Sequence, residues 1–228
     1  MDQTQQFWWN WWINAGVATS TFLAVLAALF GPLVVEFLRS KWFPPLIRLH
    51  LLSAEGEKGK NRSQDGGNEK IEDVRFYHLR VSNSRRHLSP VKEVQVFLVR
   101  VEEPGPGGSL IVAWASEIPM TWRNQQVSPL TRTIGHDYDC DLCSVGKDNW
   151  LSLSPLIFPI TLKARRRELC TMIVSFQAKS TQTDSPICRI EIAWDGDWED
   201  GDSEIKRHLV IKELDDNATE QSLLHCSV

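Results

Sequence analysis

The chain has 228 residues, with 29 acidic and 25 basic side chains, a formal net charge of -4 and five cysteines. This length suffices for one folded domain beside an anchor and is too short to argue for two domains. The weakly acidic balance gives no electrostatic footprint for nucleic acid, so nucleic acid is not among the expected partners.

The first element is an apolar segment. No residue in 3–35 carries a formal charge, and most are apolar. At ~1.5 Å rise per residue, residues 13–35 can cross a ~30 Å hydrocarbon layer as a helix. A cleaved signal peptide is the alternative, but it requires a basic n-region, a shorter apolar core and a small-residue cleavage site. We therefore predict a transmembrane anchor over residues 1–45 that contacts the lipid bilayer.

The charges beside this segment predict its orientation. Asp2 is the one charged residue ahead of it, whereas Arg39, Lys41 and Arg48 follow it. Because an excess of Lys and Arg marks the cytoplasmic side, we expect the N-terminus outside and the rest of the chain in the cytoplasm. A single-pass protein of the bacterial inner (plasma) membrane is the expected setting. An aromatic belt marks the outer interface and consists of Phe7, Trp8, Trp9, Trp11 and Trp12.

Small residues in the segment fall on one side of the predicted helix. At ~100° per residue they occupy about a quarter of the circumference, opposite the bulky side chains. These residues are Gly16, Ser20, Ala24, Ala27 and Gly31. Such spacing lets helix backbones approach closely and predicts a homo-oligomer, although single spans are often rich in Gly and Ala for other reasons. Pro32 predicts a kink in the helix.

A β-rich domain is predicted over residues 46–214. Pro44 and Pro45 end the helix, and a strand over 47–51 alternates apolar and polar residues. Residues 53–73 are almost free of apolar side chains and predict a mobile loop. Residues 215–228 are expected to form a flexible tail.

The strongest strand signals flank a polar turn. Residues 74–83 and 91–101 are rich in β-branched and aromatic side chains, which predicts a hairpin. Further strands are expected over 110–114, 150–153, 169–178, 187–194 and 208–214. Short strands with turns between them, and no long amphipathic helix, predict a mainly β protein with an antiparallel β-sandwich.

The segment YHLRVSNSRRHLSPVKEVQVFLVRV resembles the strand–turn–strand of immunoglobulin-like and fibronectin type III-like bacterial domains. It is also similar to the cytoplasmic sandwiches of uncharacterised single-pass bacterial membrane proteins. The turn departs from that pattern, because Ser84, Arg85 and Arg86 stand where such domains often have glycine. No Cys and Trp occupy the places of an antibody-type core. The resemblance implies an immunoglobulin-like sandwich and no activity.

Three potential metal ligands are close in sequence: His136, Cys140 and Cys143. Their spacing is permissive for zinc, but a structural zinc site usually has two such pairs and this chain has one Cys-x2-Cys. We therefore expect no metal and no cofactor. The odd number of cysteines, in a domain placed in a reducing compartment, predicts loop or strand-edge thiols that can be replaced without loss of stability.

An acidic turn holds further candidates for binding. Its carboxylates are Asp195, Asp197, Glu199, Asp200 and Asp202. As a calcium loop it fails, because Asp200 replaces the glycine at position six and Lys206 replaces the bidentate Glu. A solvated hairpin connection is expected, with Trp194 in the core and Trp198 as an exposed contact; another cation geometry stays open.

A basic run includes Lys163, Arg165, Arg166 and Arg167. With Arg39, Lys41, Arg48, Arg85 and Arg86 it could form a patch for anionic headgroups, while a solvated turn is the more common reason for such a run.

No catalytic motif accompanies these features. The chain has no Gly-x-Ser-x-Gly and no glycine-rich phosphate loop, and His78 lies in a predicted strand. We therefore expect a binding, sensing or scaffold module, as in bacterial defence or stress systems, that contacts a cytoplasmic protein or small ligand. The alternative is an effector whose oligomerised helices perturb the membrane.

Overall fold

The computed structural model describes residues 2–42, 44–65, 68–85, 90–123 and 130–214. The chain divides into two compact units, residues 1–44 and 45–228. The predicted C-terminal tail lies outside the described residues.

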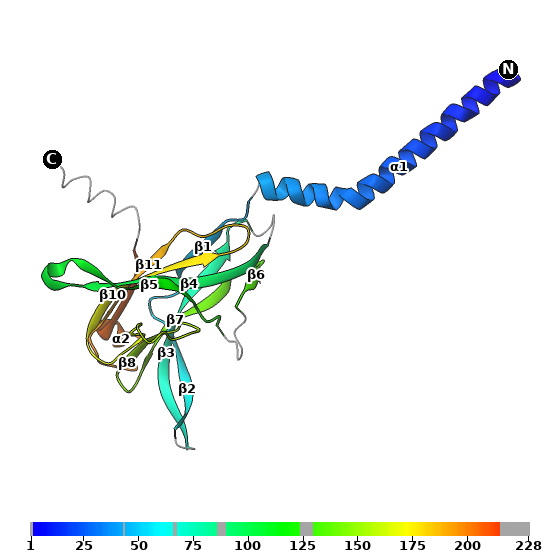
Figure 1. Cartoon of the computed structure of the whole chain (residues 1–228). Helices are drawn as coiled ribbons and strands as arrows, with labels where there is room; N and C mark the ends of the chain where they lie inside the picture. The colour runs from blue at the N-terminus through cyan, green and yellow to red at the C-terminus, as the bar shows by residue number, and fades with distance from the viewer. Residues whose placement is uncertain (1, 43, 66–67, 86–89, 124–129, 215–228) are drawn as a thin grey trace, which may run out of the picture. The chain divides into compact units, whose positions relative to one another are not determined.

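The first unit is one helix, α1 (Gln3–Trp42). Its stretch Gln5–Val35 is long enough and apolar enough to cross a membrane. The helix ends before Pro44, as predicted, and contains Pro32. Figure 1 shows that its axis bends in the second half, as expected of a proline that removes a helix hydrogen bond.

The second unit consists of two antiparallel sheets. One, the β3 sheet, has the order β1-β3-β7-β8-β9, with β2 also paired to β3. The other, the β10 sheet, has the order β12-β11-β10-β4-β5, with β6 also paired to β4. A mainly β fold with one N-terminal apolar helix is thus confirmed.

The strand bounds in the β3 sheet are β1 (Ile47–Leu51), β2 (Glu57–Asp65), β3 (Asn68–Asn83), β7 (Tyr138–Gly146), β8 (Trp150–Leu153) and β9 (Arg165–Arg166). Those in the β10 sheet are β4 (Val91–Pro104), β5 (Leu110–Pro119), β6 (Arg132–Ile134), β10 (Cys170–Lys179), β11 (Cys188–Trp194) and β12 (Leu209–Leu214). Two short helices are η1 (Pro106–Gly108) and α2 (Ile205–His208).

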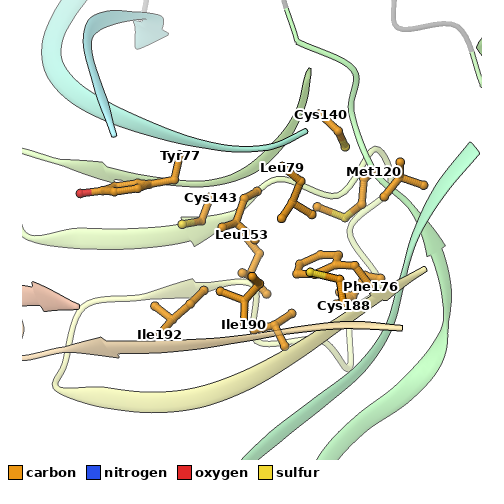
Figure 2. Packing of buried hydrophobic residues seen from close by; sticks show 14 of the residues in the cluster. Tyr77, Leu79, Met120, Cys140, Cys143, Leu153, Phe176, Cys188, Ile190 and Ile192 are labelled. Atoms are coloured by element: carbon orange, nitrogen blue, oxygen red, sulfur yellow. The ribbon is translucent and has the colours of Figure 1, made fainter. Parts of the chain in front are cut away.

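The apolar core lies between the two sheets. Alternate residues of β10, such as Val174 and Phe176, are fully buried, and Ile190 and Ile192 of β11 lie beside them. Figure 2 shows Phe176, Ile190 and Ile192 opposite Leu79 from the β3 sheet. Period-2 burial along paired strands explains why the sequence pattern predicted the strands at 169–178 and 187–194 to within one residue.

The predicted hairpin between 74–83 and 91–101 is wrong. β3 pairs with β1, β2 and β7, whereas β4 pairs with β10, β5 and β6. The chain therefore passes from one sheet to the other between these strands. Both strands have an apolar face, and placing them in opposite sheets buries both faces against one core.

The predicted loop at 53–73 is also wrong, because β2 and the start of β3 pair there from Glu57↔Phe76 to Asp65↔Asn68. Figure 1 shows this polar hairpin extending away from the rest of the sandwich. We call residues 57–73 the β2–β3 arm. The two strands of the arm pair through backbone hydrogen bonds, which form whether the side chains are polar or apolar. The polar composition of the arm therefore gave no strand signal in the sequence.

Candidate functional site

The outward face of the β3 sheet carries polar side chains on adjacent strands. On β7 and β8 the inward residues include Val145, Leu151 and Leu153, which belong to the core. Successive side chains of a strand point to opposite faces. Ser144 and Ser152, which are direct cross-strand partners, therefore lie on the outward face.

A pocket of about 400 Å³ opens over this polar face. Asn61 and Glu72 reach it from the β2–β3 arm, and Arg165 reaches it from β9. Four hydroxyl groups also line it, from Thr121, Ser144, Ser152 and Ser154. Residues far apart in the sequence thus bring hydroxyl, amide, carboxylate and guanidinium groups to one hollow.

Trp150 forms an aromatic part of the pocket lining and is 5% exposed. A Cβ atom added to Gly146 would lie 2.2 Å from the indole, so glycine is required for the ring to cross this strand. The Arg165 guanidinium lies 4.6 Å from the ring centroid, within cation–π range. The indole Nε1 has no hydrogen-bond partner among the described residues. The pocket lining therefore includes a Trp whose N–H donor is unused.

Asp141 lies between this pocket and a smaller one of about 220 Å³. Its Oδ1 is 2.9 Å from Nδ1 of His78, the residue opposite it on β3. The His78 side chain is 6% exposed, and that of Asp141 is 25% exposed. The pair fixes the Asp141 carboxylate while leaving part of it open to a ligand.

A chain of ion pairs continues from this point across the sheet. The Asp139 carboxylate accepts hydrogen bonds from the guanidinium groups of Arg80 at 3.1 Å and Arg123 at 3.3 Å. Arg123 also forms an ion pair with Glu57 on the arm. Arg80 and Asp139 are cross-strand neighbours, as are His78 and Asp141. The outward face is therefore held in one arrangement by opposite charges.

A histidine oriented by a carboxylate is also part of many catalytic sites, where it activates a nucleophile. Within the described part of the chain, Asp141 is the one side chain that makes a hydrogen bond with His78. No hydroxyl group of these residues is placed against the imidazole as a nucleophile.

The predicted acidic turn connects β11 to α2 and β12. Asp195 accepts hydrogen bonds from the Asp197 amide at 2.9 Å and from His208 at 2.8 Å. Desolvation by burial opposes ionisation of Asp195, but these hydrogen bonds outweigh it and lower its pKa. Ligand atoms of Asp195, Asp197 and His208 lie within 4.8 Å of one another, the one such group among the described residues. Pairing with His208 and solvent exposure account for this cluster without a cation.

Two further carboxylates of this turn, Asp200 and Asp202, bind to the β3 sheet, while Glu199 lies 3.5 Å from Nε2 of His208. Oδ1 of Asp202 lies 2.6 Å from Nη2 of Arg75. Nζ of Lys58 lies within 3.7 Å of Oδ1 in both Asp200 and Asp202. Trp198 is half-buried and packs against the core, in contrast to the predicted exposed contact, whereas Trp194 is buried as predicted. The turn is therefore attached to the β3 sheet through exposed carboxylates.

The basic run does not form one patch with Arg48. Arg48 lies on β1 and Arg165 on β9, which are opposite edges of the β3 sheet. Arg166 pairs with Glu103, while Lys163, Arg165 and Arg167 are exposed. The side chains of Arg39 and Arg86 lie outside the described residues. Of this run, the structure brings Arg165 to the pocket.

The predicted loop around Cys140 and Cys143 is strand β7. Both thiols are buried in the core, as Figure 2 shows, while His136 is exposed and contacts Tyr138. Burial raises the pKa of both thiols well above its usual range. The four described cysteines, Cys140, Cys143, Cys170 and Cys188, are free thiols, as predicted. Cys140 and Cys143 were expected to be replaceable by Ser with nearly unchanged thermal stability; their burial instead predicts a cost for placing a hydroxyl there.

The five small residues of the predicted helix contact all lie in α1. Gly16, Ser20, Ala24 and Ala27 are exposed, and Gly31 is partly exposed. The Ser20 hydroxyl donates to the carbonyl of Val17 at 2.9 Å. The face thus carries no unsatisfied hydroxyl and could approach a second helix closely.

The sequence patterns did not identify most of the residues that line the two pockets. His78 was interpreted as an ordinary strand histidine, and Asp141 as part of a cysteine-rich loop. The alternation of Asp139 and Asp141 with Cys140 and Leu142 is the period-2 signal that would have placed both carboxylates on one face of a strand. The contribution of the β2–β3 arm depends on tertiary structure, and no local pattern indicates it.

Comparison of the chain with family models, curated proteins and solved structures finds no match in any of the three.

Proposed function

We propose that this protein is a membrane-anchored binding module whose ligand occupies the pocket on the outward face of the β3 sheet. The observation that carries the proposal is the convergence of polar groups from the β2–β3 arm, β7, β8 and β9 on one hollow of about 400 Å³. This volume lies in the range of ligand sites, about 300–1,000 Å³, in which a few placed polar groups determine orientation.

The lining indicates the ligand class. Asp141 and Glu72 accept hydrogen bonds from hydroxyl or amino groups, and the four hydroxyls can donate or accept. Arg165 offers a planar cation that suits a carboxylate or phosphate. A small polar molecule with hydroxyl or amino groups and one acidic group fits this set.

The test is capture of small molecules from cell extract by the full-length protein in detergent, with mass spectrometry of what is released. Wild type is expected to retain a polar, acidic compound that Ser152→Trp loses, because the larger side chain fills the pocket. Ser116→Trp, at an exposed position of β5 outside the pocket lining, serves as the control. Equal retention by wild type and Ser152→Trp would place the ligand elsewhere.

The anchor and its orientation are a separate part of the proposal. The span Gln5–Val35 and the cations Lys41 and Arg48 after it support a single-pass protein with its sandwich in the cytoplasm. A reporter that is active only in the cytoplasm, fused after Val228, should be active. A silent reporter, together with an active periplasmic reporter at the same site, would reverse the orientation.

The small-residue face of α1 supports a second candidate function, an effector whose clustered helices perturb the membrane. Overexpression of the chain should then depolarise cells even with Ser152→Trp in the pocket. Depolarisation that disappears with Ser152→Trp, or none at all, would favour the binding module.

A further inference from the structure

The connection between β8 and β9 exposes large apolar side chains at its tip. Ile157 is 60% exposed, Phe158 61% and Ile160 104%. We call residues 156–162 the β8–β9 loop. Three large apolar side chains open to solvent within four residues mark an interaction surface, because monomeric proteins rarely expose such clusters without function.

The loop is held at both ends. The Leu156 amide donates to the carbonyl of Pro119 at 2.8 Å, and Leu162 is buried. Thr161 and Leu162 line a small hollow together with Ala113 and Trp114 of β5. The loop therefore follows the edge strand β5 with its ends fixed, so the exposure of its tip is a property of the fold.

Basic side chains follow the apolar tip. Lys163, Arg165 and Arg167 are exposed at alternate positions, and Arg166 between them pairs with Glu103. Nζ of Lys163 lies 3.6 Å from Oε1 of Glu168 in an ion pair that is itself exposed to solvent. Arg165 and Phe158 line the same pocket, so a cation and an apolar side chain lie near each other in space. Apolar and aromatic side chains beside cations are the pattern by which proteins bind anionic bilayers, since the former enter the interface and the latter pair with headgroups.

We propose that the β8–β9 loop docks the sandwich on an anionic membrane surface, with Lys163 and Arg167 at the headgroups. Residues 43–46 join α1 to β1, so the chain between helix and sandwich spans less than about 20 Å. If α1 crosses the bilayer, the sandwich is permanently close to the lipid. Docking is then an intramolecular step, and the sandwich does not have to bind the membrane from free solution. Each cation removed should lower the ratio of docked to free sandwich about fivefold.

The test places an environment-sensitive fluorophore on Ile160→Cys in full-length protein, in lipid discs of phosphatidylcholine with or without phosphatidylglycerol. The four described cysteines are buried, and Cys226→Ser removes the remaining thiol. Emission should shift to the blue in phosphatidylglycerol discs, and lipids with nitroxide on the acyl chain should quench it. Lys163→Gln with Arg167→Gln should lower the docked ratio about 25-fold.

Val210→Cys is the matched control, an apolar residue 47% exposed on β12, and it should show neither change. Absence of quenching at position 160, or equal quenching at 210, would overturn the proposal. A blue shift without nitroxide quenching that grows with the number of chains per disc would also overturn it, since a second copy would then cover the loop. Lys163 and Arg167 do not line the pocket, so ligand capture should persist in the double variant and failure of docking stays distinct from failure of the proposed function.

Discussion

Arg75 is a charged residue buried to 1% exposure, and it joins parts of the fold that the sequence keeps far apart. From β3, its Nη1 donates to the carbonyl of Glu55 at 2.7 Å, and its Nη2 reaches Asp202 in the turn after β11. The hydrogen bond from Arg75, aided by Lys58, lowers the pKa of Asp202. One guanidinium therefore holds the acidic turn against the opposite sheet.

Arg75→Met should lower the free energy of unfolding by about 1–3 kcal/mol, because the turn loses its buried donor while the methionine keeps much of the packing. Lys58→Met, which removes an exposed cation from the same carboxylates, should change it by less than about 0.5 kcal/mol. Urea unfolding of the detergent-solubilised protein measures both values. Equal losses would show that the turn is held by its net charge and not by Arg75.

His208 should make stability depend on pH. Its hydrogen bond to Asp195 raises its pKa, and Glu199 adds to the shift. A raised pKa contributes stability that is present below the unfolded value of about 6.5 and is lost as pH rises through the folded value. The advantage of wild type over His208→Gln in melting temperature should therefore be largest below about pH 6.5 and should shrink as the pH rises above that value.

The lowered pKa of Asp195 acts in the opposite direction at acidic pH. Its contribution is present above about pH 4 and is lost as pH falls through the folded value, so it does not affect the alkaline window. His50→Gln is the control, since His50 makes no ion pair among the described residues. A gap between wild type and His208→Gln that stays constant with pH would contradict the ion pair.

At the scale of elements, the sequence predicts the strands that have one apolar face and fails for those that do not. β10 and β11 repeat buried residues at every second position. The β2–β3 arm has no such face, and β9 has two residues, so neither leaves a periodic signal. The predicted β3–β4 hairpin failed for another reason: local patterns identify strands but do not determine which sheet each one joins.

The same limit explains the candidate site. Arg165 was predicted as a binding residue from its charge, and the structure brings it to the pocket. The residues around it come from the arm, β7 and β8, and their meeting depends on sheet order, which a single sequence does not reveal. The acidic turn was predicted as a solvated connection, and Asp200 and Asp202 are exposed, but their ion pairs with Lys58 of β2 depend on tertiary structure and were not predicted.

Removing the outer part of the arm should separate folding from binding. Replacing residues 60–73 by Asn-Gly closes a two-residue hairpin between Gly59 and Val74, which are already paired. No described side chain in that segment belongs to the core, so the melting temperature should change by less than about 4 °C. The pocket loses Asn61 and Glu72, so ligand capture should fall. Unchanged capture would show that the arm has no part in the site.

At the scale of the whole molecule, the two units differ in what stabilises them. The sandwich buries its apolar residues in its own core. In α1, by contrast, large side chains such as Phe22 and Leu29 are each 63% exposed, which suits a helix that is long and apolar enough to cross a membrane. Within the lipid, the hydrophobic effect gives no preference for another helix, and association depends on close packing.

The last prediction concerns that packing. A Cβ atom added at Gly16 would meet nothing within 4 Å in its own chain, so a larger side chain there is compatible with the isolated helix. If the small-residue face holds two copies together, Gly16→Ile or Ala24→Ile should reduce crosslinking of the full-length protein in membranes by keeping the backbones apart. Leu26→Ile, on the bulky side of the helix, should leave crosslinking unchanged. Equal crosslinking in all three variants and wild type, or a monomeric wild type, would mean that α1 serves as an anchor alone and that the sandwich carries the function.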